Sequence, residues 1–367
     1  MDRLAVKEGG MKALALVEAR DHVCCRYRIA AFDRALRASG WSLATEPLAP
    51  GLFGRLAQFR RAADHDVVIL QRKLLPGWQL AELRRRARRL IFDFDDAVLY
   101  RDSYDPRGPH HRRRRARFER TVRLADTVIA GNDFLAGRAV DAGARADRVR
   151  VIPTCVDTDA ARPAPRPRGD ARPGIDLVWI GSGSTMAGLE QQRPTWERVG
   201  REVPGVRLRM ICDQFLRFDA LEVVAVPWAL ATQDAAVAAG DVGISWVPDD
   251  LWSRGKCGLK VLQYQAAGLP VVTNPVGVHA GIVRPGVDGF LATTADDWVA
   301  AIRTLATDPE LRRRQGRAAR AAVEANYSVA TWSASFVAAL AGAGPPAPPA
   351  SRRVVAPARP KILAGLE

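Results

Sequence analysis

Short apolar runs alternate along this chain with longer stretches in which apolar residues recur at helical spacing. Residues 11–17, 66–70 and 89–93 are compact, mostly apolar runs, which is typical of buried strands. Residues 78–88 carry apolar positions every three to four residues, which predicts an amphipathic helix. Further strands are expected at 127–130, 148–153, 177–180, 206–211, 223–226, 242–245, 270–273 and 289–291. Further helices are expected at 27–39, 112–124, 134–142, 193–202, 233–239, 256–267, 295–307, 309–326 and 331–341.

Alternating strands and helices predict an α/β fold with parallel sheets covered on both faces. We expect two doubly wound, Rossmann-like halves, at residues 11–160 and 175–327, joined by a Pro- and Arg-rich linker at 161–174. A last helix is expected within 328–342, and the Pro- and Ala-rich tail at 343–367 is expected to be disordered. Ligands of such sheets bind at the carboxyl ends of the strands, so the site is expected in the cleft between the halves.

The composition is that of a globular protein with an unusual excess of arginine. Of 367 residues, 48% are hydrophobic and 26% are charged, and the formal net charge is +15. Such a charge would favour anionic partners, including a membrane surface, although a compositional bias toward arginine explains it equally well. The five cysteines are scattered without metal-ligand spacing, no apolar run is long enough to span a membrane, and residues 1–10 do not resemble a secretory signal. These features predict a cytoplasmic protein.

The most informative segment runs from residue 254 to residue 268, and its lysines stand out because the chain has only six. Lys256 and Lys260 lie four residues apart where a helix is expected to begin. A helix N-terminus has unpaired N–H groups and partial positive charge, so two added ammonium groups predict a diphosphate site. The alternative is a solvated helix start with two ordinary surface lysines.

A second candidate for phosphate binding is the loop after the strand at 177–180. Gly181, Ser182 and Ser184 could present backbone N–H groups and hydroxyls to a diphosphate. A plain strand-to-helix turn would have a similar composition.

Three carboxylates, Asp93, Asp95 and Asp96, stand at the end of the strand at 89–93. Like charges so close together repel, which favours a role in catalysis or acceptor binding, or in a metal site. The spacing of Asp93 and Asp95 is also similar to the nucleophile motif of haloacid-dehalogenase-like phosphatases. Capping of a turn is the structural alternative.

Basic side chains are expected near the same strand ends. Arg26 and Arg28 follow the first strand and Arg72 follows the second, so they could bind an acceptor or a phosphate. The arginine excess is the competing explanation. The basic run at 110–115 is expected to be solvated, with contact to an anionic membrane as a further interpretation.

Between about residues 11 and 341 the chain resembles GT-B glycosyltransferases of the family 4 type. The resemblance rests on several segments taken together. They are 256–272, which is similar to the donor-binding signature of the family, and 276–278, 287–291, 151–157 and 128–132. Two positions depart from the pattern, because Gly255 and Gln263 stand where the family usually has glutamates.

The resemblance implies transfer of a sugar from a nucleotide-diphosphate sugar to an acceptor hydroxyl, with retention and without metal or cofactor. It implies that Lys260, Asp95 and Asp96 are catalytic and that Gln263 holds the donor ribose through its amide. The residues expected to bind the donor are Gly181, Ser182, Ser184, Arg254, Lys256, Cys257, Gly258, Lys260 and Gln263; Arg26, Arg28 and Arg72 are expected on the acceptor side.

The expected partners are a nucleotide-sugar donor and a carbohydrate or lipid-linked acceptor, with peripheral contact to the inner membrane face as an extension. Two alternatives remain open at this stage. One is the phosphatase, using Asp93 and Asp95, and the other is a protein that binds sugar nucleotides without turnover. Specific nucleic-acid binding is not expected, since no platform of aromatic and basic residues is present.

Overall fold

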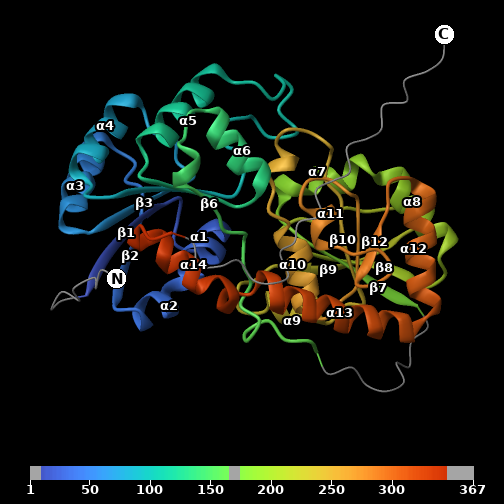
Figure 1. Cartoon of the computed structure of the whole chain (residues 1–367). Helices are drawn as coiled ribbons and strands as arrows, with labels where there is room; N and C mark the ends of the chain where they lie inside the picture. The colour runs from blue at the N-terminus through green and yellow to red at the C-terminus, as the bar shows by residue number, and fades with distance from the viewer. Residues whose placement is uncertain (1–9, 165–173, 345–367) are drawn as a thin grey trace, which may run out of the picture.

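A computed structural model describes residues 10–164 and 174–344 and contains two parallel six-stranded sheets, each with helices on both faces (Figure 1). The N-terminal sheet has the order β2-β1-β3-β4-β5-β6 and the C-terminal sheet has the order β12-β11-β10-β7-β8-β9. The N-terminal strands are β1 (Met11–Val17), β2 (Trp41–Pro47), β3 (Val67–Gln71), β4 (Leu90–Phe94), β5 (Thr127–Ala130) and β6 (Val149–Val151). The C-terminal strands are β7 (Ile175–Ile180), β8 (Val206–Cys212), β9 (Glu222–Pro227), β10 (Val242–Ser245), β11 (Val271–Thr273) and β12 (Gly289–Leu291). The predicted fold class is confirmed.

The helices connect successive strands and cover the sheets. In the N-terminal half they are α1 (Val23–Arg28), α2 (Asp33–Ala38), α3 (Leu52–Arg61), α4 (Gly77–Arg86), α5 (Arg112–Leu124) and α6 (Asp133–Asp141). The C-terminal half has α7 (Gly183–Gln191), α8 (Arg193–Glu202), α9 (Gln233–Ala238), α10 (Leu259–Ala266), α11 (His279–Ile282), α12 (Ala295–Thr307) and α13 (Pro309–Tyr327). No helix among the described residues is long and apolar enough to cross a membrane.

The central strands are the ones whose residues are buried on both faces. All residues of β3, β4 and β7 are buried, which explains why their sequences are almost continuously apolar. Each sheet has one apolar core on each face, so the described residues form four apolar clusters in two pairs.

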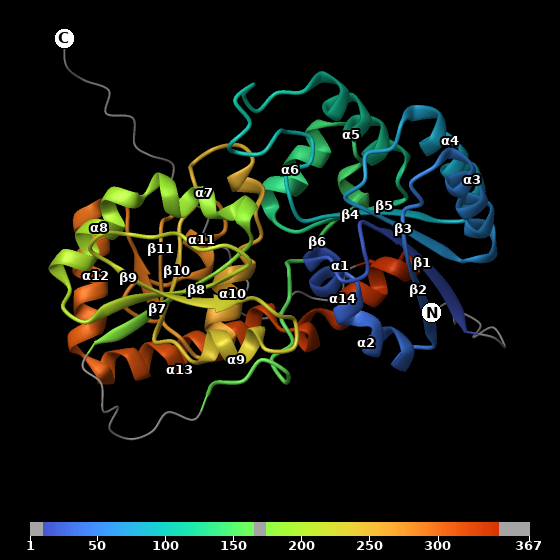
Figure 2. The same cartoon turned by 180° about the vertical axis from the view of Figure 1, so that it is seen from behind.

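The last helix, α14 (Val329–Ala341), returns from the C-terminal half to pack on the N-terminal half beside α2 (Figure 2). Phe336 stacks on Phe32 with ring centroids 4.3 Å apart, and Trp332 is buried in the same cluster. Ser328 is bridged to Val156 at the start of this return. The chain therefore passes between the two halves twice, once between β6 and β7 and once between α13 and α14.

Several predicted elements change in detail. The helix expected at 27–39 is divided into α1, a short 3-10 turn (Ala30–Phe32) and α2. Strand β2 and helices α3, α7 and α11 were not predicted. The helix expected from residue 256 begins only at Leu259. Most of the linker at 161–174 and of the tail at 343–367 lies outside the described residues.

Candidate functional site

Two segments that are far apart in sequence meet where the halves touch. Asn132, after β5, donates its side-chain amide to the carbonyl oxygens of Gly255 and Lys256, at 3.1 and 3.2 Å. The Cys257 thiol donates to the carbonyl of Asp95, after β4, at 3.2 Å. The lysine-containing segment of the C-terminal half therefore rests directly on the carboxyl edge of the N-terminal sheet.

The predicted helix N-terminus is displaced from the position that the sequence suggested. Lys256 and Cys257 precede α10, in an extended segment that follows a 3-10 turn (Ser253–Gly255). Gly258 is the N-cap with a φ of 70°, and a Cβ there would lie 2.6 Å from Ile282 Cδ1. Glycine is required at this position because both the left-handed backbone and the close approach exclude a side chain. Only Lys260 of the pair belongs to the first turn of the helix.

Lys260 lies in an environment that disfavours its charge. Its Nζ is 4.3 Å from the centroid of the Trp179 ring and donates to Thr185 Oγ1 at 3.3 Å. Burial, with the nearby charge of Lys256, lowers the pKa of Lys260 to about 7. Within the described parts of the chain, no carboxylate forms an ion pair with Lys256 or Lys260. Two basic side chains that form no direct ion pair with a carboxylate are the arrangement expected of an anion site.

The second predicted phosphate-binding segment adjoins this pair. Ser182 and Ser184 are exposed at the start of α7, with their hydroxyls 2.9 Å apart. Thr185 Oγ1 accepts from the Ser182 N–H at 3.1 Å and from Lys260, so one side chain joins the two segments. A Cβ at Gly181 would lie 2.4 Å from the Trp179 ring and 2.6 Å from Thr185 Oγ1, which explains the glycine.

Gln263 is buried, at 9% exposure, and points toward the other half. Its amide donates to the Tyr27 hydroxyl at 3.0 Å, and Gln233 donates to the same hydroxyl at the same distance. Arg26 lies over the rings of Tyr27 and Trp228 and reaches Gln233 Oε1 at 3.5 Å. These side chains form a polar contact across the interface at the base of the site.

Arg28 and Asp93 form a buried ion pair. The Arg28 Nη2 to Asp93 Oδ2 distance is 2.6 Å, the side chains are 2% and 0% exposed, and Arg28 also donates to the Ile152 carbonyl at 2.6 Å. The expectation that Arg28 contacts an acceptor is therefore wrong, because every direction of its guanidinium is occupied by protein. Burial raises the pKa of Asp93, which the Arg28 charge opposes. Asp93 is a structural residue, and the phosphatase alternative loses its nucleophile.

Arg72 organises the other two carboxylates. Its backbone has a φ of 58°, which is strained for a residue other than glycine, and its Nη2 donates to Asp96 Oδ2 at 2.6 Å. Its Nε lies 3.6 Å from Asp95 Oδ1, and it also donates to the Cys24 thiol. Ligand atoms of Cys24, Asp95 and Asp96 lie within 4.8 Å of one another, but the guanidinium already occupies this cluster. The geometry thus fits two carboxylates held by one guanidinium better than it fits a metal site.

Two further predicted donor residues differ in their surroundings. Arg254 is 50% exposed and pairs with Asp249 at 2.7 Å. Cys257 is buried in the apolar core of the N-terminal half, and burial strongly raises the pKa of its thiol. The Cys257 side chain is therefore not available to a donor, and it anchors the segment in the N-terminal half.

The structure also accounts for the glycine that replaces the first expected glutamate. A Cβ at Gly255 would lie 2.6 Å from Ala97 Cβ and 2.8 Å from the Ala97 nitrogen. No side chain fits at residue 255 while the two halves are in this arrangement.

Sequence reasoning missed Tyr27, Trp179, Thr185 and Gln233. Each contacts a predicted site residue. The bonds of Tyr27 with Gln263, of Thr185 with Lys260 and of Gln233 with Arg26 join residues at least 75 positions apart along the chain. The position of a residue near the end of a strand was the only signal in the sequence that could have identified any of them. Trp179 and Thr185 lie on either side of the end of β7.

Two family profiles match the chain over much of its length. The family described as Glycosyltransferase Family 4 matches residues 17–160, and the one described as Glycosyl transferases group 1 matches residues 251–322. The first covers most of the N-terminal half and the second contains both lysines of the site. No curated protein matches the sequence.

Solved structures share the fold at low sequence identity. A crystal structure of Anabaena Alr3699/HepE in complex with UDP and glucose has a TM-score of 0.68 and 15% identity, covering 90% of this chain and 100% of that one. Sucrose-phosphate synthase from Thermosynechococcus elongatus has a TM-score of 0.68 and 16% identity, with coverage of 91% and 97%. The lipopolysaccharide outer core galactosyltransferase WaaB has a TM-score of 0.63 and 11% identity, with coverage of 90% and 99%.

Two facing Rossmann-like halves place the chain in the GT-B fold class, and the two family profiles identify it as a glycosyltransferase. Within that class, the chain belongs to the family 4 type, the glycosyl transferases group 1.

Proposed function

We propose that this enzyme transfers a sugar from a nucleotide-diphosphate sugar to an acceptor hydroxyl, with retention of configuration and without a metal or a cofactor. The observation that carries the proposal is the pair Lys256 and Lys260, which forms no direct ion pair with a carboxylate among the described residues and adjoins the Ser182–Ser184 turn. A diphosphate supplies the missing negative charge. The structural relatives of HepE type, described as complexes with UDP and with UDP-glucose, support a donor of this kind.

The two lysines act on the leaving group. As the bond from the sugar to the diphosphate breaks, negative charge grows on the diphosphate oxygens, and ammonium groups fixed beside them stabilise that charge. Lys260 is the better placed, because its restricted exposure to water strengthens its interaction with a phosphate. This role replaces the charge that a divalent metal supplies in other transferases.

The remaining residues bind and orient the substrates. The exposed hydroxyls of Ser182 and Ser184 are available to the diphosphate. Gln263 binds the ribose by giving up its hydrogen bond to the Tyr27 hydroxyl and bonding a ribose hydroxyl instead. Asp95 and Asp96, fixed by Arg72, orient the acceptor and the transferred sugar from the opposite half. Contact between the halves excludes water, which would otherwise hydrolyse the donor.

The test is Lys260→Ala, assayed with a panel of nucleotide sugars for both transfer and binding. Loss of one electrostatic stabiliser of the transition state costs about 10²- to 10³-fold in kcat. The exposed Lys12 on β1, whose charge change is identical, is the matched control. Equal rates in Lys260→Ala and in the wild type would refute the assignment. Donor binding without turnover in the wild type would favour the non-catalytic alternative.

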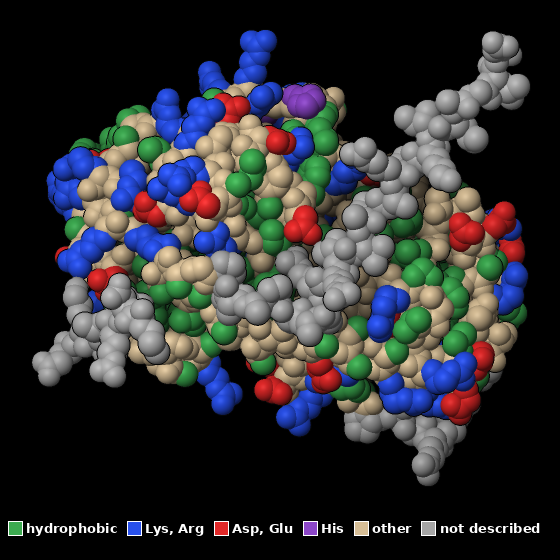
Figure 3. All heavy atoms as spheres, viewed as in Figure 1, with side chains coloured by type: hydrophobic (Ala, Val, Ile, Leu, Met, Phe, Trp, Pro, Cys, Tyr) green, Lys and Arg blue, Asp and Glu red, His purple; other side chains and the backbone are tan. Residues whose placement is uncertain are grey.

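The acceptor is proposed to be a carbohydrate or a lipid-linked molecule on the cytoplasmic side of the membrane. Basic side chains are spread across the N-terminal half, as Figure 3 shows, and they would favour peripheral contact with anionic lipid. Co-sedimentation with vesicles containing phosphatidylglycerol, compared with phosphatidylcholine vesicles, tests this contact; equal recovery with both would exclude it.

A further inference from the structure

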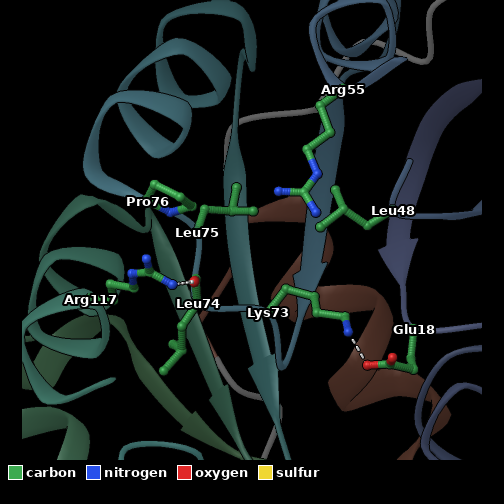
Figure 4. A pocket seen from close by; sticks show the side chains of 8 residues that line it. All are labelled: Glu18, Leu48, Arg55, Lys73, Leu74, Leu75, Pro76 and Arg117. Atoms are coloured by element: carbon green, nitrogen blue, oxygen red, sulfur yellow. Dashed lines mark hydrogen bonds and ion pairs between the residues drawn. The ribbon is translucent and has the colours of Figure 1, made fainter. Parts of the chain in front are cut away.

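A cavity of about 270 Å³ opens at the carboxyl edge of the N-terminal sheet, apart from the lysine pair of the C-terminal half. Its walls come from the segments after β1, β2 and β3 and from helices α3 and α5 (Figure 4). The lining residues are Glu18, Leu48, Arg55, Lys73, Leu74, Leu75, Pro76 and Arg117. All of them belong to the N-terminal half, which is the side opposite to the donor.

The charge of this cavity is positive. It contains three cationic side chains and one carboxylate, Glu18, which is paired with Lys73. Arg55 and Arg117 have no carboxylate partner among residues 10–164 and 174–344. Figure 4 shows both guanidinium groups directed toward the cavity from opposite sides. The lining therefore carries about two uncompensated positive charges.

Neutral groups hold these two arginines in place. Arg55 donates to the Ala49 carbonyl at 2.7 Å and to Gln79 Oε1 at 2.9 Å, and Arg117 donates to the Leu74 carbonyl at 3.4 Å. These acceptors satisfy some N–H groups but leave the charge unbalanced. Cations fixed around one cavity repel each other, and an anion between them removes that cost.

The cavity and the proposed acceptor side lie at the same carboxyl edge of the N-terminal sheet. Lys73 directly follows Arg72, whose guanidinium holds Asp96. Its rim is apolar as well as basic, since Leu48 and Pro76 line it and Trp78, 53% exposed, stands in the first turn of α4 beside it. A molecule anchored here through an anion would extend toward Asp96 along one edge of the sheet.

We propose that this cavity is an acceptor subsite that binds a phosphate group, so that the acceptor is a phosphorylated molecule. The identification of the bound molecule as the acceptor rests on the proposed function. The binding of phosphate itself depends only on Arg55, Lys73 and Arg117. The planar guanidinium groups suit a phosphate because each can donate two parallel hydrogen bonds.

Calorimetric titration of the full chain with inorganic phosphate and with octyl phosphate tests the subsite. Octyl glucoside, which has the same alkyl chain and no anion, is the neutral comparison. Arg55→Gln and Arg117→Gln should each weaken phosphate binding about tenfold, the value of one charge-assisted hydrogen bond. Arg60→Gln on α3 and Arg113→Gln on α5 make the same charge change on exposed positions of the same helices and should bind as the wild type does.

Three results would overturn the inference. They are no binding of either phosphate by the wild type, equal loss in the control variants, or octyl phosphate affinity that Arg55→Gln and Arg117→Gln leave unchanged. Tighter binding of octyl phosphate than of inorganic phosphate supports a lipid-linked phosphate, and equal binding supports a soluble one. Nucleotide-sugar titration of the same variants separates the two proposals, because donor binding requires Lys260 and not Arg55.

Discussion

The low pKa of Lys260 predicts that donor affinity depends on pH. In the free enzyme Lys260 has a pKa of about 7, so it is mostly protonated at pH 6 and mostly neutral at pH 8. A bound diphosphate favours the ammonium form and returns the pKa toward its ordinary value. The affinity is therefore full below the pKa of the free enzyme and declines as the pH rises through it.

The size of the effect follows from the same pKa. If the bound lysine stays protonated, the dissociation constant for a nucleotide sugar rises about tenfold between pH 6 and pH 8. A nucleotide sugar is a better probe than a free nucleoside diphosphate, because its diphosphate has no terminal group with a second ionisation near pH 6. Calorimetric titration at intervals across this range measures the slope directly.

The control replaces the titrating group without removing its charge. Lys260→Arg stays protonated at every pH of the experiment, so its affinity should be nearly constant between pH 6 and pH 8. The reasoning is refuted if the wild-type affinity does not change over this range, or if Lys260→Arg shows the same slope.

Three further predictions concern the packing of the two halves and of the site between them. Gly255→Glu restores the residue that is usual in the family. It should slow transfer at least tenfold, because the new side chain clashes with Ala97 and pushes the halves apart. A small-angle scattering profile identical to that of the wild type would contradict this separation. Phe336→Ala should lower the free energy of unfolding by about 3–5 kcal/mol in urea titration, because it opens a cavity in the core of the N-terminal half. Tyr27→Phe should change KM for the donor and leave kcat nearly constant, because it releases Gln263; a loss confined to kcat would argue against that role.

The fold could be predicted from the sequence because its signals are local. Buried strands such as β1 and β5 are compact, mostly apolar runs, and their observed bounds are those expected. Strand β2, by contrast, lies at the edge of the sheet, where only Trp41 is buried. Its apolar run is interrupted by Ser42, Thr45 and Glu46. Helix α7 contains Gly183 and Gly188, which weaken its helical pattern.

The site could be predicted only where one segment carries the chemistry. Lys256 and Lys260 stand out by their rarity, and Asp95 and Asp96 by their place after a strand. The burial of Arg28 could not be predicted from the sequence, because its ion-pair partner, Asp93, is 65 positions away along the chain. The same limit applies to Cys257, whose neighbours come from the other half of the chain.

Cys257 belongs to the C-terminal half by sequence but is packed in the core of the N-terminal half, in a space that Gly131 leaves open. Opening of the two halves must withdraw this thiol, and with it the backbone that positions Lys256. Donor occupancy and separation of the halves are therefore thermodynamically linked, and each must shift the other by the same free energy. The thiol thus serves as a built-in reporter: its rate of alkylation should measure how often the enzyme opens, and a bound donor should slow it.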